Sequence, residues 1–422
     1  MSLEVVLGLA VFVATYALIV TERVHKTIAA MAGGMAMILL GVVDQDRAFE
    51  EIDFNVIFLL AGMMILAGIL RQTGIFGWLA VRSARLARGE PYRLLVVLSL
   101  ITAVASAFLD NVTTVVLVGP ITLFLAARLG MSPMPFIVSE ILASNIGGAA
   151  TLIGDPPNLL IGSAADLGFD AFLLNMAPLS ALLLALYLVA ARWLFRNDLK
   201  ADPALREGLL QLDEREMITN PRLLRLSLIV LGGTLIGFLL HGPLHLEPAT
   251  VALTGAVVLM VVARQSPDEV LREVEWPTLF FFIGLFMLVA GVIEIGLIEA
   301  VADAIVALTG NALGPTSVLL LWMSATLSGL VDNIPYTATM IPVVEQLAGG
   351  HESDALWWAL AIGADLGGNA TIIGASANVI LAGMAEREGH PISFGKFLRY
   401  GLPVTIATML VATGYVWVRY LL

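Results

Sequence analysis

The chain has 422 residues, of which 59% are hydrophobic and 13% are charged, and its formal net charge is −12. A soluble domain carries roughly 25% charged residues, so this chain has too little polar surface to cover a water-soluble globule. The absence of cysteine excludes disulfides, thiolate metal sites and cysteine nucleophiles. The composition therefore predicts an all-α polytopic membrane protein, and the acidic balance excludes the basic surface typical of nucleic-acid binding.

Apolar runs in the first half are long enough to cross a bilayer core of roughly 30 Å. We expect membrane spans at residues 3–20, 27–43, 54–70 and 172–195, the first of them retained rather than cleaved. Residues 75–89 differ, because Arg82, Arg85 and Arg88 recur there at helical spacing. That pattern is typical of an amphipathic helix lying at the membrane interface.

The second half repeats this order after a charged linker at residues 197–222. Spans are expected at residues 223–240, 248–264, 277–293 and 397–420, with a short amphipathic piece ending at residue 310. Motifs recur as well, since Asp110-Asn111 returns in the second half as Asp332-Asn333. A period of half the chain is too long for a solenoid and is typical of the duplicated halves of membrane transporters.

Two apolar stretches, residues 92–128 and 315–347, are interrupted near their middles by Asp-Asn. Lys and Arg gather in the loops near residues 21–26 and 71–93 and in the linker, which places these segments in the cytoplasm. These assignments agree only if each interrupted stretch enters and leaves the membrane on one side. The first is therefore predicted to be a re-entrant hairpin opening to the cytoplasm, and the second a hairpin opening outside.

The predicted organisation is an inverted repeat. Repeat 1 covers residues 1–196, with its hairpin at 92–128 and a broken helix at 134–165; the cytoplasmic linker covers 197–222; repeat 2 covers 223–422, with its hairpin at 315–347 and a broken helix at 355–384. Each repeat then has about five crossings, and an odd number turns the second repeat upside down in the membrane.

The hairpin tips are candidate binding positions. A carboxylate at bilayer depth costs roughly 2.5–3.5 kcal/mol unless it is paired or faces water. Each tip aspartate could simply cap the helix that follows it, and capping is compatible with ion binding at a helix terminus. Tips that approach the midplane from opposite faces would bring together Asp110, Asn111, Asp332 and Asn333, with hydroxyls from Thr113, Thr114 and Thr337 close by.

The broken helices carry a second set of candidates, because the block from Asn145 to Asn158 matches the block from Asp365 to Asn378. Paired glycines and tandem prolines would open the helix and free backbone carbonyls, which suit Na⁺ as hard oxygen ligands. The alternative is a kinked helix that packs closely through small residues. The predicted binding residues in these blocks are Asn145, Gly147, Gly148, Thr151, Asp155, Asn158, Asp365, Asn369, Thr371, Ser376 and Asn378.

The two blocks differ in where they carry aspartate. Asn145 aligns with Asp365, and Asp155 aligns with Ala375, so each half supplies two intramembrane carboxylates at different places. Several carboxylates in one apolar core favour a site for cations or protons and disfavour a bare anion. The expected Na⁺ ligands are Asn111, Asn145, Asn158, Asn333, Asp365 and Asn378, and no transition-metal site is expected.

At these motifs the chain resembles the ion transporter superfamily, and most of all its arsenite permease and sodium–proton antiporter group, which includes the melanosomal P protein. The resemblance lies in Phe108 to Thr114, Asn145 to Asn158, Val331 to Pro335 and Gly363 to Asn369. It implies the fold of the divalent-anion/sodium symporters, with a scaffold domain, a moving domain that carries the hairpins, a homodimer and elevator-type alternating access.

The chain also departs from the anion symporters in this superfamily. Their hairpin tips carry Ser-Asn-Thr, whereas the tips here carry Asp110-Asn111-Val112 and Asp332-Asn333-Ile334. The symporter-like Thr-Pro-Pro is here Asp155-Pro156-Pro157. These changes disfavour dicarboxylate transport and agree with the handling of cations or protons inferred from the residues.

The leading functional hypothesis is a secondary active transporter of the cell (inner or plasma) membrane that performs H⁺- and/or Na⁺-coupled exchange. The alternatives are a proton-driven efflux permease for arsenite, a Na⁺-coupled carrier of organic or inorganic anions, and a cation channel. An enzyme is not expected, because no catalytic triad, phosphate-binding loop or zinc motif is present. Lipid and a small transported solute are the expected partners, and Na⁺ or H⁺ is the expected coupling ion without a further cofactor.

Overall fold

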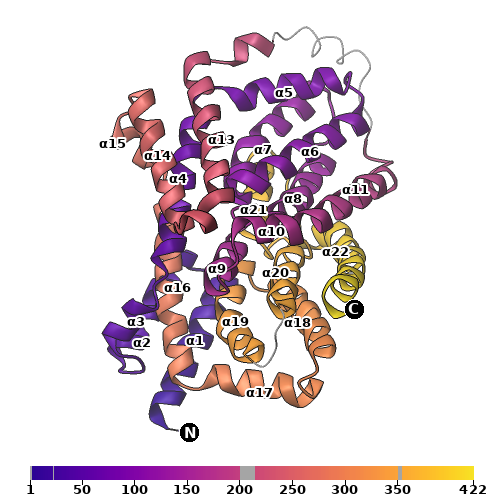
Figure 1. Ribbon diagram of the computed structural model, residues 1–422. Helices are drawn as coiled ribbons and strands as arrows, with labels where there is room; N and C mark the ends of the chain where they lie inside the picture. The colour runs from indigo at the N-terminus through magenta and orange to yellow at the C-terminus, as the bar shows by residue number, and fades with distance from the viewer. Residues whose placement is uncertain (1, 22, 200–213, 350–353) are drawn as a thin grey trace.

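The computed structural model describes residues 2–21, 23–199, 214–349 and 354–422. Within these ranges the chain consists of helices joined by turns and loops, without strands (Figure 1). The first half contains α1 (Leu3–Thr21), α2 (Lys26–Leu39), α3 (Gln45–Glu50), α4 (Phe54–Arg71), α5 (Ile75–Leu86), α6 (Pro91–Leu109), α7 (Asn111–Arg128), α8 (Met134–Gly148), α9 (Pro156–Ala164), α10 (Phe169–Asn175) and α11 (Ala177–Leu194).

The described part of the second half contains a matching series of helices. It comprises η1 (Glu214–Met217), α13 (Pro221–Leu244), α14 (Pro248–Ala263), α15 (Pro267–Val270), η2 (Leu271–Glu273), α16 (Trp276–Glu294), α17 (Leu297–Thr309), α18 (Leu313–Ser328), α19 (Asn333–Ala348), α20 (Ala355–Gly367), α21 (Ser376–Arg387), α22 (Phe394–Val416) and the π-helical η3 (Trp417–Leu421). Eight helices among the described residues are long and apolar enough to cross a membrane, which confirms the prediction of an all-α polytopic membrane protein.

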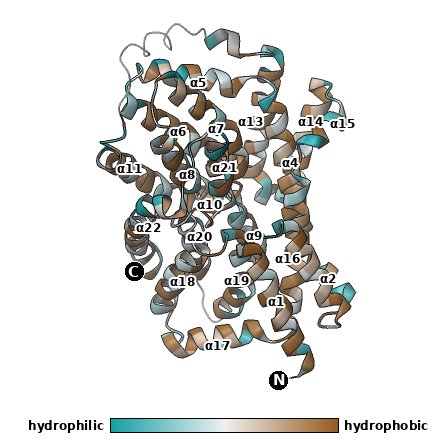
Figure 2. Ribbon diagram, turned by 180° about the vertical axis from the view of Figure 1, so that it is seen from behind, coloured by the Kyte–Doolittle hydropathy of each residue, from teal (hydrophilic) through white to brown (hydrophobic). Residues whose placement is uncertain are grey.

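Hydrophobic residues make up most of the length of the helices. In Figure 2 most of the ribbon is brown (hydrophobic), and teal (hydrophilic) stretches occur at helix ends, for example near α15 and α2. Apolar side chains remain exposed on the outermost helices, among them Leu3, Val13, Ile229 and Val261. Such surfaces are stable in a lipid environment, where exposed apolar atoms carry no hydrophobic penalty.

The helices form two groups that lie side by side (Figures 1 and 2). In one group α2 packs against α16, α4 against α14, and α1 and α13 flank these pairs. In the other group α6 packs against α8, α18 against α20, and α7 and α19 against α21 and α9. The hairpin and broken-helix sequences therefore lie together, apart from the long helices of the first group.

Close packing in the first group recurs at equivalent positions of the two halves. A Cβ atom at Gly62 of α4 would lie 2.8 Å from the backbone carbonyl carbon of Ala252 in α14. A Cβ atom at Gly284 of α16 would lie 2.6 Å from that of Ala30 in α2. Each half thus contributes one glycine-bearing helix to a tight pair with a helix of the other half, and the duplication seen in the sequence reappears in the packing.

Some predicted spans are divided in the structure. The run at residues 172–195 forms α10 and α11 instead of one helix, because Pro178 stands in the first turn of a new helix that begins at Ala177. The run at 27–43 yields the shorter helix α2, which ends at Leu39 before Gly41 turns the chain with φ +70°. The counterparts α5 and α17 lie at opposite ends of the molecule, as an inverted repeat requires, and the inversion itself stays a prediction (Figure 1).

The glycine contact between α4 and α14 gives a test of this packing. We expect Gly62→Ala to destabilise the protein by about 1–3 kcal/mol, because its methyl group would collide with backbone rather than with a movable side chain. Gly233→Ala on α13 is the matched control, since no atom lies within 4 Å of a Cβ atom there. Thermal unfolding in one detergent measures both variants, and equal midpoints would contradict the proposed close contact.

Candidate ion-binding site

The two tip aspartates cap the helices that follow them. Oδ1 of Asp110 accepts the backbone N–H of Thr113 at 2.8 Å, and Oδ1 of Asp332 accepts that of Ile334 at 3.1 Å. Asp110 adopts a positive φ of 73°, a conformation that non-glycine residues rarely take. Capping leaves the second carboxylate oxygen of each aspartate available for other contacts.

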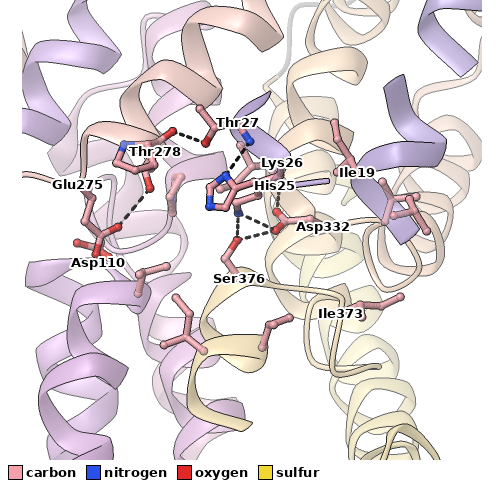
Figure 3. A pocket seen from close by; sticks show the side chains of 18 of the residues that line it. Ile19, His25, Lys26, Thr27, Asp110, Glu275, Thr278, Asp332, Ile373 and Ser376 are labelled. Atoms are coloured by element: carbon pink, nitrogen blue, oxygen red, sulfur yellow. Dashed lines mark hydrogen bonds and ion pairs between the residues drawn. The ribbon is translucent and has the colours of Figure 1, made fainter. Parts of the chain in front are cut away.

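Both tip aspartates line one cavity of about 520 Å³ between the two groups of helices (Figure 3). Asp110 reaches it from the start of α7, and Asp332 reaches it from the start of α19. Ser376 at the start of α21 lines the same cavity and donates its hydroxyl to Oδ2 of Asp332 at 2.6 Å. The structure therefore brings the two tips to one hollow, as the sequence predicts.

Asp155 connects the two tips. Its Oδ2 atom accepts Nδ2 of Asn111 at 2.9 Å, and its Oδ1 atom accepts Nδ2 of Asn333 at 3.2 Å. All three side chains are buried, and Asp155 is completely inaccessible to solvent. One carboxylate from a broken helix thus ties the tip of the first hairpin to the tip of the second.

The asparagines that close the two blocks hold the broken helices in shape. Nδ2 of Asn158 donates to the carbonyl of Thr151 at 3.0 Å and to that of Gly148 at 3.4 Å. In the second half, the carbonyls of Thr371 and Gly368 accept Nδ2 of Asn378 at 3.0 and 2.7 Å. Because a backbone carbonyl can only accept and the amide nitrogen is the only donor of an asparagine side chain, these bonds fix the orientation of both amides and leave their Oδ1 atoms free to point elsewhere.

Thr151 and Thr371 are occupied by structural bonds. The Thr151 hydroxyl donates to the carbonyl of Ala107 in α6, and the Thr371 hydroxyl donates to that of Gly329 at 2.5 Å. Each bond ties a broken helix to the hairpin of its own half. In this conformation the two threonines anchor backbone instead of offering free ligands.

Gly147 and Gly148, two of the predicted binding residues, serve close packing in this conformation. Gly147 contacts the backbone of Ala103 so closely that a Cβ atom would overlap it, and Gly148 lies against Gly154 across the broken helix. The carbonyl of Gly148 is used by Asn158. The alternative of tight packing through small residues therefore describes these two glycines, while the helix is also broken as predicted, between α8 and α9.

Asn145 joins the two broken helices. Its Nδ2 atom donates to Oδ1 of Asn378 and to Oδ1 of Asn369, both at 3.0 Å. Its own Oδ1 atom is buried and has no protein partner. The first half thus contributes an N–H donor to the Oδ1 atom of Asn378 in the second half.

Asp365 occupies the position in the second half that matches Asn145 in the first. It is completely buried, and both of its carboxylate oxygens lack a hydrogen-bond partner. Asn158 is its neighbour, and the Oδ1 atom of Asn158 is also buried without a partner. In the first half the matching residue Asn145 donates to Oδ1 of Asn378, whereas the ionised carboxylate of Asp365 has no hydrogen to donate to Oδ1 of Asn158.

The remaining predicted hydroxyls divide into two kinds. Thr113 donates its backbone N–H to the capping carboxylate of Asp110 and lines a small recess beside Glu275. The hydroxyls of Thr114 and Thr337 are buried and without a partner. Within the described ranges no three His, Cys, Asp or Glu side chains group as a metal centre would require.

Three cavity residues were missed by the sequence reasoning, namely His25, Lys26 and Glu275. Nζ of Lys26 lies 3.4 Å from Oδ2 of Asp332, and it also bonds the Ser376 hydroxyl. Glu275 lies beside Asp110 on the other side of the cavity and accepts the Thr278 hydroxyl at 3.2 Å (Figure 3). Lys26 counted only as a loop cation in the sequence, because no spacing relates it to a residue in the other half of the chain.

The bridging role of Asp155 leads to a stability prediction. Asp155→Ala leaves two buried amides unpaired, at about 1–3 kcal/mol for each group, so we expect a clear loss of thermal stability. Asp155→Asn keeps one acceptor oxygen and should lie between this variant and the wild type. Thermal unfolding of purified protein in detergent provides the measurement.

Asp365→Asn is the matched control for this test. Neither carboxylate oxygen of Asp365 has a hydrogen-bond partner, and an amide there removes a buried charge, so the midpoint of this variant should equal or exceed that of the wild type. A similar loss for Asp155→Ala and Asp365→Asn would mean that the two bonds to the tips do not account for the effect.

Comparisons with known proteins agree with this architecture. A family model described as citrate transporter (CitMHS) matches residues 16–363. An uncharacterized transporter of Mycobacterium bovis is 46% identical over 424 residues, covering 98% of both chains. The human P protein is 35% identical over 503 residues that cover 99% of this chain and 60% of that protein.

A solved structure also shares the fold. The YdaH transporter of Alcanivorax borkumensis aligns with a TM-score of 0.59 and 18% identity, covering 98% of each chain. At this identity the likeness concerns the fold alone. The family match and the extent of the sequence identity nevertheless agree with the resemblance inferred from the motifs. The chain therefore belongs to the CitMHS citrate transporter family of the ion transporter superfamily and is a multi-pass secondary membrane transporter.

Proposed function

We propose that this transporter couples its cycle to H⁺ or Na⁺ taken up at Asp365. The observation that carries the proposal is the completely buried Asp365 carboxylate, neither of whose oxygens has a hydrogen-bond partner, next to Asn158, whose Oδ1 atom is also buried without a partner. An unpaired buried carboxylate is costly, and the cost disappears when a proton or a cation binds.

A proton would complete the symmetry of the site. Asn145 donates an N–H to Oδ1 of Asn378, and a protonated Asp365 would donate its O–H to Oδ1 of Asn158 in the same way. Sodium would serve equally, because it prefers several hard oxygen ligands. Asp365, Asn158 and the free Oδ1 atom of Asn145 would then supply oxygens from both broken helices.

The cavity charges favour a cation as the exchanged species. Asp110, Glu275 and Asp332 face the hollow, and Lys26 is the one lysine or arginine among the described residues that line it. A bare anion entering here meets more negative than positive charge, whereas a cation is attracted. We therefore place H⁺- and/or Na⁺-coupled exchange first.

Elevator-type alternating access is the mechanism that we infer for this exchange, in a homodimer with the inter-repeat linker in the cytoplasm. The group that contains the hairpins and broken helices would move against the group built from α1, α2, α4, α13, α14 and α16. A second cavity of about 560 Å³, lined by Leu159, Asp166 and His241, supports two access routes. Leu159 there corresponds to Val379 of the first cavity, its counterpart in the second broken helix.

Cation-coupled transport of citrate is the second candidate. The description of the matching family favours it, and Lys26 and His25 offer the cavity cationic or hydrogen-bonding groups for a carboxylate. The acidic residues around them would require the anion to travel with its coupling cations. The cavity gives no further support for arsenite efflux, so arsenite is included only as one of the solutes tested in the liposome experiment.

Reconstitution into liposomes tests the proposal. We expect an imposed Na⁺ gradient to change the internal pH, and a pH gradient to move ²²Na⁺. Asp365→Asn supplies a permanent donor to Asn158, so it should fold normally and reduce exchange to the level of empty liposomes. Asp303→Asn, on the exposed side of α17, is the control and should exchange like the wild type.

The same liposomes separate the alternatives. Citrate uptake that requires Na⁺ or a pH gradient would favour the second candidate. Arsenite movement driven by protons would favour metalloid efflux, and dissipative ion flux without coupling would indicate a channel. Full exchange activity in Asp365→Asn would overturn the role of this carboxylate.

A further inference from the structure

A polar contact ties the second hairpin to α2 across the boundary between the two groups of helices. The Lys26 ammonium lies 3.4 Å from Oδ2 of Asp332 and bonds the hydroxyl of Ser376, which itself donates to Asp332. Figure 3 shows these three side chains converging in the cavity. The side chain of Asp332 is 13% exposed and that of Lys26 is 30% exposed, so water reaches the pair from one side.

A second polar contact crosses the same boundary. The Tyr16 hydroxyl on α1 donates to the carbonyl of Pro335 in α19 at 2.6 Å and also bonds the Thr339 hydroxyl. The first turns of α19 are therefore attached to α1 and to α2 at two separate points. Apolar packing elsewhere along this boundary can slide, whereas these directed bonds must break before α19 moves.

The first hairpin lacks both attachments. Thr27 and Ala249 are equivalent positions of the two halves, as are Asn55 and Pro277. The Thr27 hydroxyl donates to the carbonyl of Pro277, and the backbone N–H of Ala249 donates to Oδ1 of Asn55. Pro248 therefore stands at the position equivalent to Lys26. Pro248 carries neither a charge nor a donor. Among the described residues Asp110 consequently has no ammonium partner, although the same Asp-Asn pair stands at both tips.

The tyrosine contact is likewise confined to one half. Thr15 packs on Gly33 in the same way that Thr234 packs on Gly255, the counterpart of Gly33 in the second half. The residue after each threonine is Tyr16 in one half and Leu235 in the other. Thr339, the partner of Tyr16, corresponds to Leu117 in the first hairpin. Two independent polar links thus distinguish otherwise duplicated hairpins.

We propose that Lys26 is a tethered counter-ion that latches the second hairpin to α2, and that a cation bound at Asp332 releases it. The ammonium occupies the place that an exchanged cation would take beside Asp332. Competition for one carboxylate makes the two exclusive, because two cations cannot share it at close range. Release of the latch rests on the cation uptake proposed above, whereas the latch itself does not.

Several charged or polar groups lie around the latch. Facing it are His25 before α2, Glu275 before α16, Asp110 before α7 and Asp155 before α9. Carboxylates outnumber the one ammonium in this region, so a cation that competes with Lys26 is attracted to it.

The natural absence of cysteine allows a direct test that needs no transport. Val379→Cys reports on the cavity beneath the latch, and Leu159→Cys reports on the equivalent position of the second cavity. Each single cysteine is modified by an uncharged thiol reagent in detergent. The ratio of the two rates cancels any change that affects both positions alike, such as a change in general stability.

We expect Lys26→Gln to raise this ratio by about fivefold or more, the low end of typical coupling between sites. Lys26→Arg keeps the charge and should retain the wild-type ratio, and Tyr16→Phe should raise it less. Addition of Na⁺ should raise the ratio in the wild type and have no effect in Lys26→Gln. Tyr16→Phe removes one hydroxyl only and keeps the test valid if Lys26→Gln folds poorly.

An unchanged ratio in both Lys26→Gln and Tyr16→Phe would overturn the latch, as would equal acceleration at Val379→Cys and Leu159→Cys. Addition of Na⁺ separates the latch from the proposed function. If the variants raise the ratio while Na⁺ leaves the wild-type ratio unchanged, the latch stands and its release by the coupling cation is wrong. Na⁺ that raises the wild-type ratio supports both.

Discussion

The fold and the site of this transporter depend on two hydrogen bonds to the carboxylate of Asp155, one from each hairpin tip. Asn111 and Asn333 lie far apart in the chain, and each would be an unpaired buried amide without this acceptor. Their shared dependence on one side chain brings the hairpins, and with them Asp110 and Asp332, to a single cavity. The broken helix that begins after Asp155 is therefore required for the site as well as for the fold.

Around Asp155, equivalent residues of the two halves make the same hydrogen bonds, but the two halves carry their charged side chains at different positions. Asn158 and Asn378 make the same backbone bonds, and Thr151 and Thr371 anchor the same hairpin carbonyls. The two halves differ at a position that can bind a proton or a cation, because Asn145 carries an N–H donor where its counterpart Asp365 carries a carboxylate. A duplicated frame can hold two equivalent half-sites while one substitution confines protonation or cation uptake to one of them.

Sequence reasoning predicted much of this fold. Hydrophobic runs located the spans, and the repeated motifs located both hairpin tips and both broken helices, because backbone breaks at membrane depth need Gly, Pro and polar side chains. It predicted a single span at residues 172–195, where the structure has the two helices α10 and α11, because in a sequence a proline at the start of a helix, such as Pro178, looks the same as a proline tolerated inside one. It also missed Lys26 and Glu275, whose positions beside short apolar runs resemble ordinary loop charges.

The sequence by itself determined the membrane class, the duplicated halves and the chemical character of the site, because composition and periodicity express how a chain meets lipid. Only the tertiary structure decided which polar atoms are satisfied. It gave Asp155 two donors, left Asp365 with none and set Lys26 against Asp332. Such pairings depend on side chains that lie far apart in the chain, and their geometry arises from packing that no local pattern encodes.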